Sequence, residues 1–473
     1  MDRRQLISGA GALALSSTFS AAGAWAQSPR IRRDVGLLDS NDPFFDAYAL
    51  AVRRMHELAP SDPRHWSNQA RIHLRHCPHG RATFCHWHRH YLARFEAICA
   101  SVLGEPDFAL PYWDWAANSG VIPAPFFDRP ELSFATWDIG ADGDVGTEGK
   151  RSLTKDKGLL ADSLSGADFA PSKLYSILVY GEYENFRRAL ERPHNNAHVI
   201  IGRGGGHMSS MMSPLDPLFW LHHCNVDRLW AQWQAAGNTS PPLSENYGGQ
   251  FVGADGAPVQ DATSANALDI AAFGYTYDVL HEAGLILRGP WSGAVDGAGA
   301  GPSSLRVQID RVGRASQGEA ILGGTAREFA VSAPNLERNL LDRTRSRTFW
   351  LPNAALERPT LAERRPRVVA SLKNVRLASH APDVTARVFV NCPYLAPDTP
   401  ASAPHYAGSC GFFGASHHGA PVEFDIDLTD TLLGLAGQGQ IDFSEINLQV
   451  VATGADQATP VDVTVGEVEI VAI

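Results

Sequence analysis

The spacing of apolar residues divides the chain into a helical part and a strand-rich part. In the first part, apolar residues recur at helical spacing, as between Leu221 and Trp233, and residues 93–100 contain good helix formers without glycine or proline. Proline-rich turns such as VIPAPFFDRP at 121–130 indicate long connections. We therefore expect residues 27–288 to form a mainly α-helical domain with long loops.

A different pattern follows a short linker. Residues 289–304, GPWSGAVDGAGAGPSS, are rich in glycine, serine and proline, which is typical of a flexible connection. Beyond it, several segments alternate polar and apolar residues and carry many β-branched side chains. These segments are RVVASL, TARVFV, VEFDIDL, INLQVVA and VDVTVGEVEIVAI. They predict a β-sandwich over residues 305–473, so the chain is expected to be an α+β multidomain protein.

The first 26 residues have the features of an export signal. Arg3 and Arg4 form a twin-arginine pair, an apolar stretch rich in Ala, Gly and Ser follows, and Ala24-Trp25-Ala26 fits an A-x-A cleavage site. A membrane anchor is the alternative, but the serines, glycines and cleavage motif argue against it. We expect residues 1–26 to be removed after twin-arginine export, which leaves a periplasmic or secreted protein without a membrane segment.

Composition narrows the classes of partner. The chain has 473 residues, 44% hydrophobic and 19% charged, which is ordinary for a globular protein. Its net charge of −11 argues against binding to nucleic acid or to anionic membranes. Six cysteines in a chain of this length are not a disulfide scaffold. Cys392 and Cys410 lie apart from the others and could pair in an oxidising compartment.

Histidines concentrate in two segments. Residues 71–96 read RIHLRHCPHGRATFCHWHRHYLARFE, and residues 192–230 read RPHNNAHVIIGRGGGHMSSMMSPLDPLFWLHHCNVDRLW. Neutral imidazole suits copper in both oxidation states, and two neighbouring coppers with three imidazoles each can bind dioxygen between them. His194 and His198 are four residues apart, so a helix would present both on one face. Zinc is the alternative, but the lack of carboxylate or thiolate ligands argues against it.

The first segment resembles the first copper signature of tyrosinases, catechol oxidases and molluscan haemocyanins. The resemblance spans His79 to Glu96, including the Trp87-His88-Arg89 run, and Cys85 departs from the usual apolar residue. It implies that His73, His79 and His88 hold one copper ion. The remaining histidines of this segment would be bystanders: His76, His86 and His90.

Cys77 stands two residues before His79. Several members of the family form a thioether between a cysteine and the second histidine of this site, so the resemblance implies a Cys77–His79 thioether. Such a bond would fix the imidazole and remove an oxidisable thiol. The alternative is an ordinary buried cysteine.

The second segment is similar to the family's second copper signature. The family pattern places a ligand seven residues after Asp216, which selects His223 over His222 and completes the set with His194 and His198. Asp227, one turn beyond His223, could steer an imidazole or a nearby arginine, or could form a surface salt bridge. Strings beyond the two segments also resemble the family: LPYWDW at 110–115, Tyr275-Thr276-Tyr277, and, as in plant polyphenol oxidases, HYAGSCGFFGASHHG at 405–419.

The resemblance implies a dicopper site in a four-helix bundle, which oxidises o-diphenols to o-quinones with O2 and hydroxylates monophenols. In the family, an Asn after the first ligand of the second site and a nearby Glu hold a water that takes the phenol proton. Asn195 and Glu191 match these roles, although they could instead be a helix cap and a solvated charge. Val199 would give the substrate pocket an apolar wall. Met208 lies in a methionine-containing loop that could pack over the pocket or take part in copper uptake.

Other functions share these residues. A catechol oxidase or an o-aminophenol oxidase would lack the monophenol step, and a haemocyanin-like protein would bind O2 without oxidising phenols. The C-terminal domain could be a permanent structural partner or a shield over the pocket, and we expect a shield.

Overall fold

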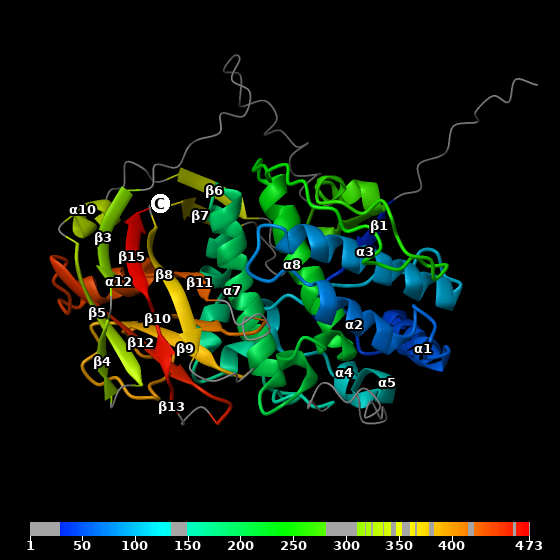
Figure 1. Cartoon of the computed structure of the whole chain (residues 1–473), viewed down its shortest axis with the longest axis horizontal. Coiled ribbons are helices and arrows are strands. Elements are labelled where there is room, and N and C mark those ends of the chain that lie inside the picture. The colour runs from blue at the N-terminus through cyan, green and yellow to red at the C-terminus, as the bar shows by residue number, and fades with distance from the viewer. Residues whose placement is uncertain are drawn as a thin grey trace, which may run out of the picture.

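The computed structural model contains a helical part and a strand-rich part that lie side by side (Figure 1). The structure describes residues 29–133, 149–280, 310–316, 318–322, 325–333, 335–341, 347–351, 360–364, 367–377, 383–414, 421–456 and 460–472. The expected export signal and the linker lie outside these residues. No helix in the described residues has the length and apolar character needed to span a membrane.

The helical part is built around one large hydrophobic cluster. Its α-helices are α1 (Pro43–Glu57), α2 (Trp66–His76), α3 (Phe84–Leu103), α4 (Pro125–Asp128), α5 (Pro130–Ser133), α6 (Pro171–Leu174), α7 (Tyr183–Gly202) and α8 (Leu218–Ala235). Local sequence sets several helix ends. Asp42 accepts a hydrogen bond from the Phe44 amide and precedes a proline at the first position of α1. At the C-terminal end of α3, Gly104 takes the left-handed conformation, with φ of 73°.

A small parallel sheet closes the helical part. Strand β1 (Arg30–Arg32) pairs with β2 (Tyr275–Tyr277), so the first and last described segments of this part are joined. Arg32 then reaches the Tyr277 hydroxyl at 3.0 Å and Glu96 at 3.0 Å, and all three side chains are buried. The Tyr275-Thr276-Tyr277 motif thus pairs with the N-terminal strand and, through Arg32, helps to hold that strand against α3.

The strand-rich part is a sandwich of two sheets, which confirms the predicted fold class. One sheet has the order β10-β9-β12-β5-β4 with β13 beside β12, and the other has the order β11-β8-β15-β3 with β14 beside β8. Side chains of both sheets form one apolar cluster between them. The strands are β3 (Asp310–Ser316), β4 (Glu319–Ile321), β5 (Ala326–Ser332), β6 (Arg347–Leu351), β7 (Thr360–Arg364), β8 (Val368–Leu377), β9 (Thr385–Val390), β10 (Tyr406–Gly411), β11 (Val422–Asp427), β12 (Glu445–Thr453), β13 (Pro460–Val461), β14 (Val463–Thr464) and β15 (Glu467–Ala472), with helices α10 (Leu336–Leu341) and α12 (Thr429–Gly437).

The final segment is not one strand. Val461 pairs with β12 of the first sheet, whereas Val463 pairs with β8 of the second sheet. The chain therefore crosses between the sheets at Asp462 before β15 begins. The alternating pattern predicts the strands but not this crossing, because both sheets accept the same alternation.

The predicted Cys392–Cys410 disulfide is wrong, because both cysteines are free. Cys410 lies opposite Ala386 on β9, while Cys392 lies six residues further along, beyond the end of β9. Six residues of extended chain span roughly 20 Å, and a disulfide needs Cα atoms within about 7 Å. The two thiols also belong to different apolar clusters.

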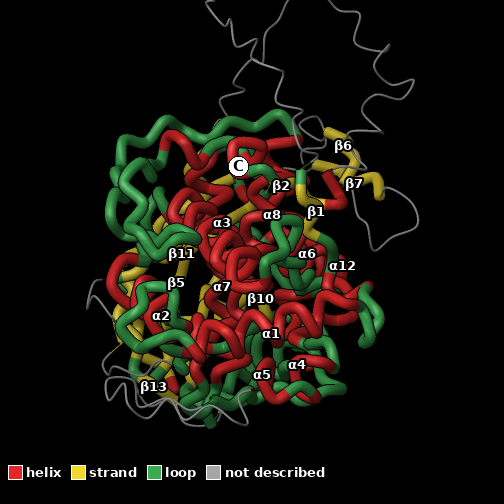
Figure 2. Tube along the Cα trace, turned by 90° about the vertical axis from the view of Figure 1, so that its right-hand side faces the viewer, coloured by secondary structure: helices red, strands yellow, loops and turns green. Residues whose placement is uncertain are grey.

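The two parts meet where α7 lies against β10 and β11 (Figures 1 and 2). Buried Asp168, in a short helical turn at Gly166–Phe169, accepts hydrogen bonds from the Ser409 hydroxyl at 2.6 Å and from Asn196 at 3.0 Å. Lys173 and Arg192 pair with its other oxygen at 3.2 Å and 3.1 Å. Burial alone would raise the pKa of Asp168, but these two cations hold it below its ordinary value. This polar cluster fastens β10 to the helical part.

Candidate metal centre

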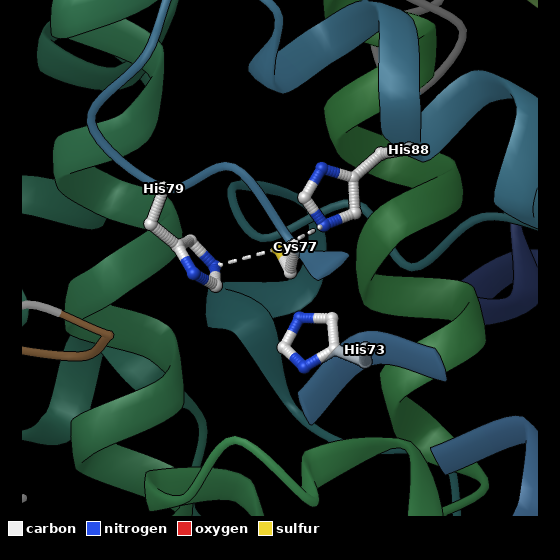
Figure 3. A group of neighbouring side chains, drawn as sticks. All are labelled: His73, Cys77, His79 and His88. Carbon is white, nitrogen blue, oxygen red and sulfur yellow. Dashed lines mark hydrogen bonds between the residues drawn. The ribbon is translucent and has the colours of Figure 1, made fainter. Parts of the chain in front are cut away.

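Four helices bring the histidines of the two sequence segments together. In the first group, α2 carries His73, α3 carries His88, and the chain between them carries Cys77 and His79. Their ligand atoms all lie within 4.8 Å of one another, and the side chains point toward one another (Figure 3). We call this group the first pocket.

Backbone carbonyls orient the imidazoles of the first pocket. His73 donates from Nδ1 to the Met211 carbonyl at 2.7 Å, and His88 donates from Nδ1 to the Phe84 carbonyl at 2.8 Å. This tautomer leaves the Nε2 lone pair of each ring to face the pocket. The Cys77 sulfur lies 3.3 Å from Nε2 of His88 and 3.5 Å from Nε2 of His79. The first pocket is therefore three imidazoles and a thiol.

The second pocket contains imidazoles only. Helix α7 carries His194 and His198 on one face, as their spacing predicts, and α8 carries His222 and His223. His194 donates from Nδ1 to the Asn195 side chain at 2.8 Å, and His198 donates from Nδ1 to the Met208 carbonyl at 2.7 Å. Asn195 and the loop that contains Met208 thus position the second pocket.

The nitrogens of the second pocket already have the spacing of a metal site. Nε2 of His223 lies 3.3 Å from Nε2 of His194 and 3.4 Å from Nε2 of His198. Two nitrogens bound to one tetrahedral ion at about 2.0–2.1 Å are about 3.3 Å apart. His194 and His198 carry their hydrogens on Nδ1, so the Nε2 atom of each has only a lone pair. A hydrogen on Nε2 of His223 can therefore bond to only one of the two at a time. A cation would satisfy all three lone pairs.

The two pockets face each other. The rings of His88 and His223 stack with centroids 4.2 Å apart, and those of His79 and His194 are 5.6 Å apart. Burial, strengthened by neighbouring imidazoles, lowers the pKa of His88, His194 and His223 well below the ordinary range. Neutral imidazoles are the ligand form that copper needs, so the donor set fits a pair of copper ions.

The other histidines of the first segment lie outside the pocket. His76 is exposed at the end of α2. His86 contacts the Tyr183 hydroxyl at 3.2 Å, and Nε2 of His90 lies 2.9 Å from the Thr263 carbonyl. His86 is buried between α3, α7 and α8, where its ring also lies 4.8 Å from that of Trp230, and His90 is buried between α3 and the loop at Thr263. In the second segment the structure adds His222, which sequence comparison set aside, to the pocket.

Asp227 is buried, which rules out the surface salt bridge. It accepts hydrogen bonds from Arg89 at 2.6 Å, Tyr275 at 2.5 Å and Tyr277 at 2.6 Å. Burial opposes its ionisation, but Arg89 and Arg32 together with the tyrosine hydroxyls keep its pKa below the ordinary value. Asp227 therefore acts on the arginine that follows His88 and joins α8 to α3 and β2 rather than touching an imidazole.

A cavity of about 360 Å³ opens between α7 and the sandwich, beside His79. Glu191 and Asn195 both line it, inside α7, so they are neither a helix cap nor a solvated charge. Glu191 accepts a hydrogen bond from the Gly80 amide at 2.5 Å and another from Arg187. Burial raises the pKa of Glu191 despite these donors.

Val199 and Met208 are fully buried and do not line this cavity. A strand of the sandwich covers Val199: a Cβ on Gly411 would lie 2.8 Å from the Val199 side chain and 2.8 Å from the Asn195 carbonyl. Only glycine lets β10 approach α7 this closely. Met208 contributes its backbone carbonyl to His198, as described above.

Phe413, from the sandwich, lies directly over the second pocket. Its ring stacks on His198 with centroids 3.7 Å apart and an angle of 5° between the planes, and it lies 5.0 Å from the His79 ring. Gly414 follows with φ of 74°, and a Cβ there would lie 2.7 Å from Nδ1 of His79. Sequence reasoning missed Phe413, and the one signal was an aromatic pair between glycines in CGFFG at 410–414.

Comparison with known proteins agrees with this geometry. Residues 51–236 match the model of the common central domain of tyrosinase. The chain is 32% identical to a tyrosinase of Streptomyces antibioticus over 236 residues, which cover 42% of this chain and 81% of that protein. It is 29% identical to the chloroplastic polyphenol oxidase E of Solanum lycopersicum over 242 residues, which cover 44% of this chain but only 41% of the plant protein.

The whole fold also has a counterpart among solved structures. The latent apple tyrosinase superposes with a TM-score of 0.60 over 94% of this chain and 98% of that chain, at 19% sequence identity. At this identity the likeness concerns the fold: a helical core and a C-terminal sandwich in the same arrangement.

Proposed function

This chain belongs to the tyrosinase family, and we propose from that membership and from its paired imidazole pockets that it oxidises phenols with O2 at a dicopper centre. The observation that carries the proposal is that His88 of the first pocket stacks on His223 of the second at 4.2 Å, so that two ions held there would be neighbours. His73, His79 and His88 would hold one ion, and His194, His198 and His223 the other.

Copper, when bound, supplies binding of O2 and transfer of electrons from the phenol. The reaction balances when two o-diphenols give four electrons and four protons to one O2, leaving two o-quinones and two waters. The chain orients the imidazoles through Asn195 and three backbone carbonyls, and it keeps water from the buried pockets. Imidazoles bring no negative charge, so the ions keep their electrophilic character.

We propose that monophenols are also substrates and that Asn195 and Glu191 hold the water that takes the phenol proton. Both side chains line the cavity next to His79. Each carboxylate oxygen of Glu191 has one donor and retains a lone pair for a water. A base whose pKa is raised by burial accepts a proton more readily near neutral pH.

The sandwich keeps this enzyme latent in our proposal, with Phe413 as the covering residue. A phenol that approaches the second pocket needs the position over His198 that the Phe413 ring fills. Substrate access would require the segment after β10 to move. The polar contacts of Asp168 hold β10 in place, so they would have to break first.

Two further features complete the proposal. Cys77 and His79 would become joined by a thioether: the S–H and one imidazole C–H are lost, a C–S bond forms, and O2 accepts the two electrons and two protons as hydrogen peroxide. The protein would reach the periplasm or the medium by the twin-arginine route.

Oxygen uptake by copper-loaded protein, with copper content measured in the same sample, tests the function. We expect two coppers per chain and uptake on both tyrosine and catechol. Uptake on catechol or o-aminophenol but not on tyrosine would refute the monophenol step. Reversible O2 binding without uptake on any phenol would identify an oxygen carrier of haemocyanin type, and fewer than two coppers would contradict the whole proposal.

A further inference from the structure

The second pocket contains one more imidazole than the assigned ligand set. His222 is completely buried, and neither of its ring nitrogens has a hydrogen-bond partner among the described residues. Its ring centroid lies 4.6 Å from that of His198 and 5.0 Å from that of His194. Its ligand atom falls within the 4.8 Å group that defines the pocket.

This burial is costly unless something compensates for it. A neutral imidazole has one donor and one acceptor, and burying either without a partner forfeits the hydrogen bond that it would make with water. An apolar residue of similar size would fill the same place against Trp115, whose ring is 5.0 Å away, without that cost. Neither neighbouring imidazole can donate to His222, because His194 and His198 use their Nδ1 hydrogens elsewhere and turn only lone pairs toward the pocket.

The geometry points to a metal ion as the compensating group. Nε2 of His223 is already at tetrahedral spacing from His194 and His198, which defines three corners of a site. His222 stands next to these rings, and one of its ring nitrogens already lies within 4.8 Å of the ligand nitrogens of the other three histidines, so it is the candidate for the fourth corner. The first pocket differs, because its fourth donor is the Cys77 thiol.

We propose that His222 is a fourth ligand that closes the second pocket when this pocket holds a single metal ion, so that the second pocket fills before the first. Four imidazoles and no open position are the features of a closed, tightly binding site. Once both pockets are filled, O2 needs an open position, and His222 returns to the place against Trp115 that the structure shows. The inference shares with the proposed function only the premise that the second pocket binds metal.

Cobalt titration of protein produced without copper, in which Cys77 has not yet formed the proposed thioether and keeps its thiol, tests the order of filling. Tetrahedral Co2+ has visible absorption, and Co2+ bound to a thiolate adds a near-ultraviolet charge-transfer band. Cys77 belongs to the first pocket and no cysteine belongs to the second, so this band reports the first pocket alone. We expect the first equivalent of Co2+ to give visible absorption without the thiolate band, and the second equivalent to add the band.

Substitution of His222 tests its part in this order. His222→Phe keeps a ring against Trp115 and removes both nitrogens, and we expect the first equivalent to bind at least about tenfold more weakly and to show the thiolate band at once. His222→Gln serves as a second variant of similar length. His86→Phe is the matched control, because His86 is equally buried, has a nitrogen without a partner among the described residues, and lies outside both pockets.

The results separate the outcomes. A thiolate band from the first equivalent in the unaltered protein overturns the proposal, and so does unchanged affinity in folded His222 variants. Near-ultraviolet circular dichroism of the metal-free variants establishes folding, and the order of bands in the unaltered protein decides the matter even if neither variant folds. Absence of any metal binding would contradict the proposed function as well, whereas the expected order without phenol oxidation would contradict the proposed function alone.

Discussion

Replacing Phe413 by alanine should activate the protein, and the structure gives the size of the effect. Opening the second pocket moves a ring that is 2% exposed into water and breaks its stacking on His198. Exposure of a buried phenylalanine costs about 1.5–3 kcal/mol, and loss of an aromatic pair costs about 0.5–1.5 kcal/mol. The open form is therefore disfavoured by about 2–4.5 kcal/mol, which corresponds to a population of open protein reduced about 30-fold to 2000-fold.

Phe413→Ala removes this cost and leaves a space the size of one benzene ring. We expect kcat/KM for catechol to rise by about 30-fold to 2000-fold, mostly through a lower KM, because a plug that competes with substrate does not alter the bound complex. Oxygen uptake at several catechol concentrations, normalised to copper content, measures this change. A catechol with a bulky substituent should gain less, since the vacated space fits only the unsubstituted ring.

Phe329→Ala is the control. Phe329 lies in the apolar cluster of the same sandwich, on β5, and is 1% exposed. Its loss loosens the sandwich by about 3–5 kcal/mol without touching the pockets, so catechol oxidation should stay low while the thermal midpoint falls. Equal gains in the two variants, or no gain in Phe413→Ala with full copper, would refute the reasoning that one ring blocks the site.

Four further predictions concern single residues. Asn195→Gly should lower the tyrosine rate about 100-fold more than the catechol rate, because proton acceptance matters only for the monophenol; equal losses would refute this role. The tyrosine rate should fall on acidification through the raised pKa of Glu191, which must be ionised, while catechol oxidation persists in the same pH series. The intact mass of copper-loaded protein should be two hydrogen atoms below the value for its sequence, whereas Cys77→Ser should match the value for its own sequence. A full count of alkylatable thiols would exclude the thioether. The lowered pKa of Asp168 means that its stabilisation of the interface is complete above the ordinary carboxyl range and is lost as pH falls through the folded-state value. Brief acid treatment should therefore activate the protein, and Asp168→Asn should be active without it; an unchanged acid response in that variant would sink this assignment.

The elements that carry the pockets could be predicted because local sequence determines them. His194 and His198 share a helix face through their spacing, and α8 forms where apolar residues recur at helical spacing between Leu221 and Trp233. The sandwich follows from alternation in its strands. These features depend on near neighbours in the chain, which sequence patterns record well.

The features that sequence reasoning missed depend on distant segments. Phe413 reaches His198 across more than two hundred residues of chain, and no local pattern records that contact. His222 and His223 are adjacent on α8, and the sequence does not show which of them points into the pocket. The packing of α8 against α7 and Trp115 decides this, and it brings His222 to the pocket as well. The sequence suggests packing or copper uptake for the loop that contains Met208, yet Met208 and Met211 act through backbone carbonyls that accept hydrogen bonds from His198 and His73.

The composition of the interface between the two parts favours a removable shield over a permanent structural partner. Among the described residues of the sandwich, Val369 and Phe413 are the buried ones that join the apolar cluster of the helical part. Val471 also packs against that cluster, and Ala167 packs against an apolar cluster of the sandwich. Many of the other contacts are polar, such as those of Asp168 with Ser409 and of Asn196 with the Gly411 amide at 2.6 Å. Permanent interfaces resemble a hydrophobic core, and separating one exposes apolar surface at high cost. Here water can replace the polar contacts, and Phe413 is the largest of the apolar side chains that pack across the interface. The main apolar cost of opening is therefore the Phe413 ring, which is also the group that must leave for a phenol to enter.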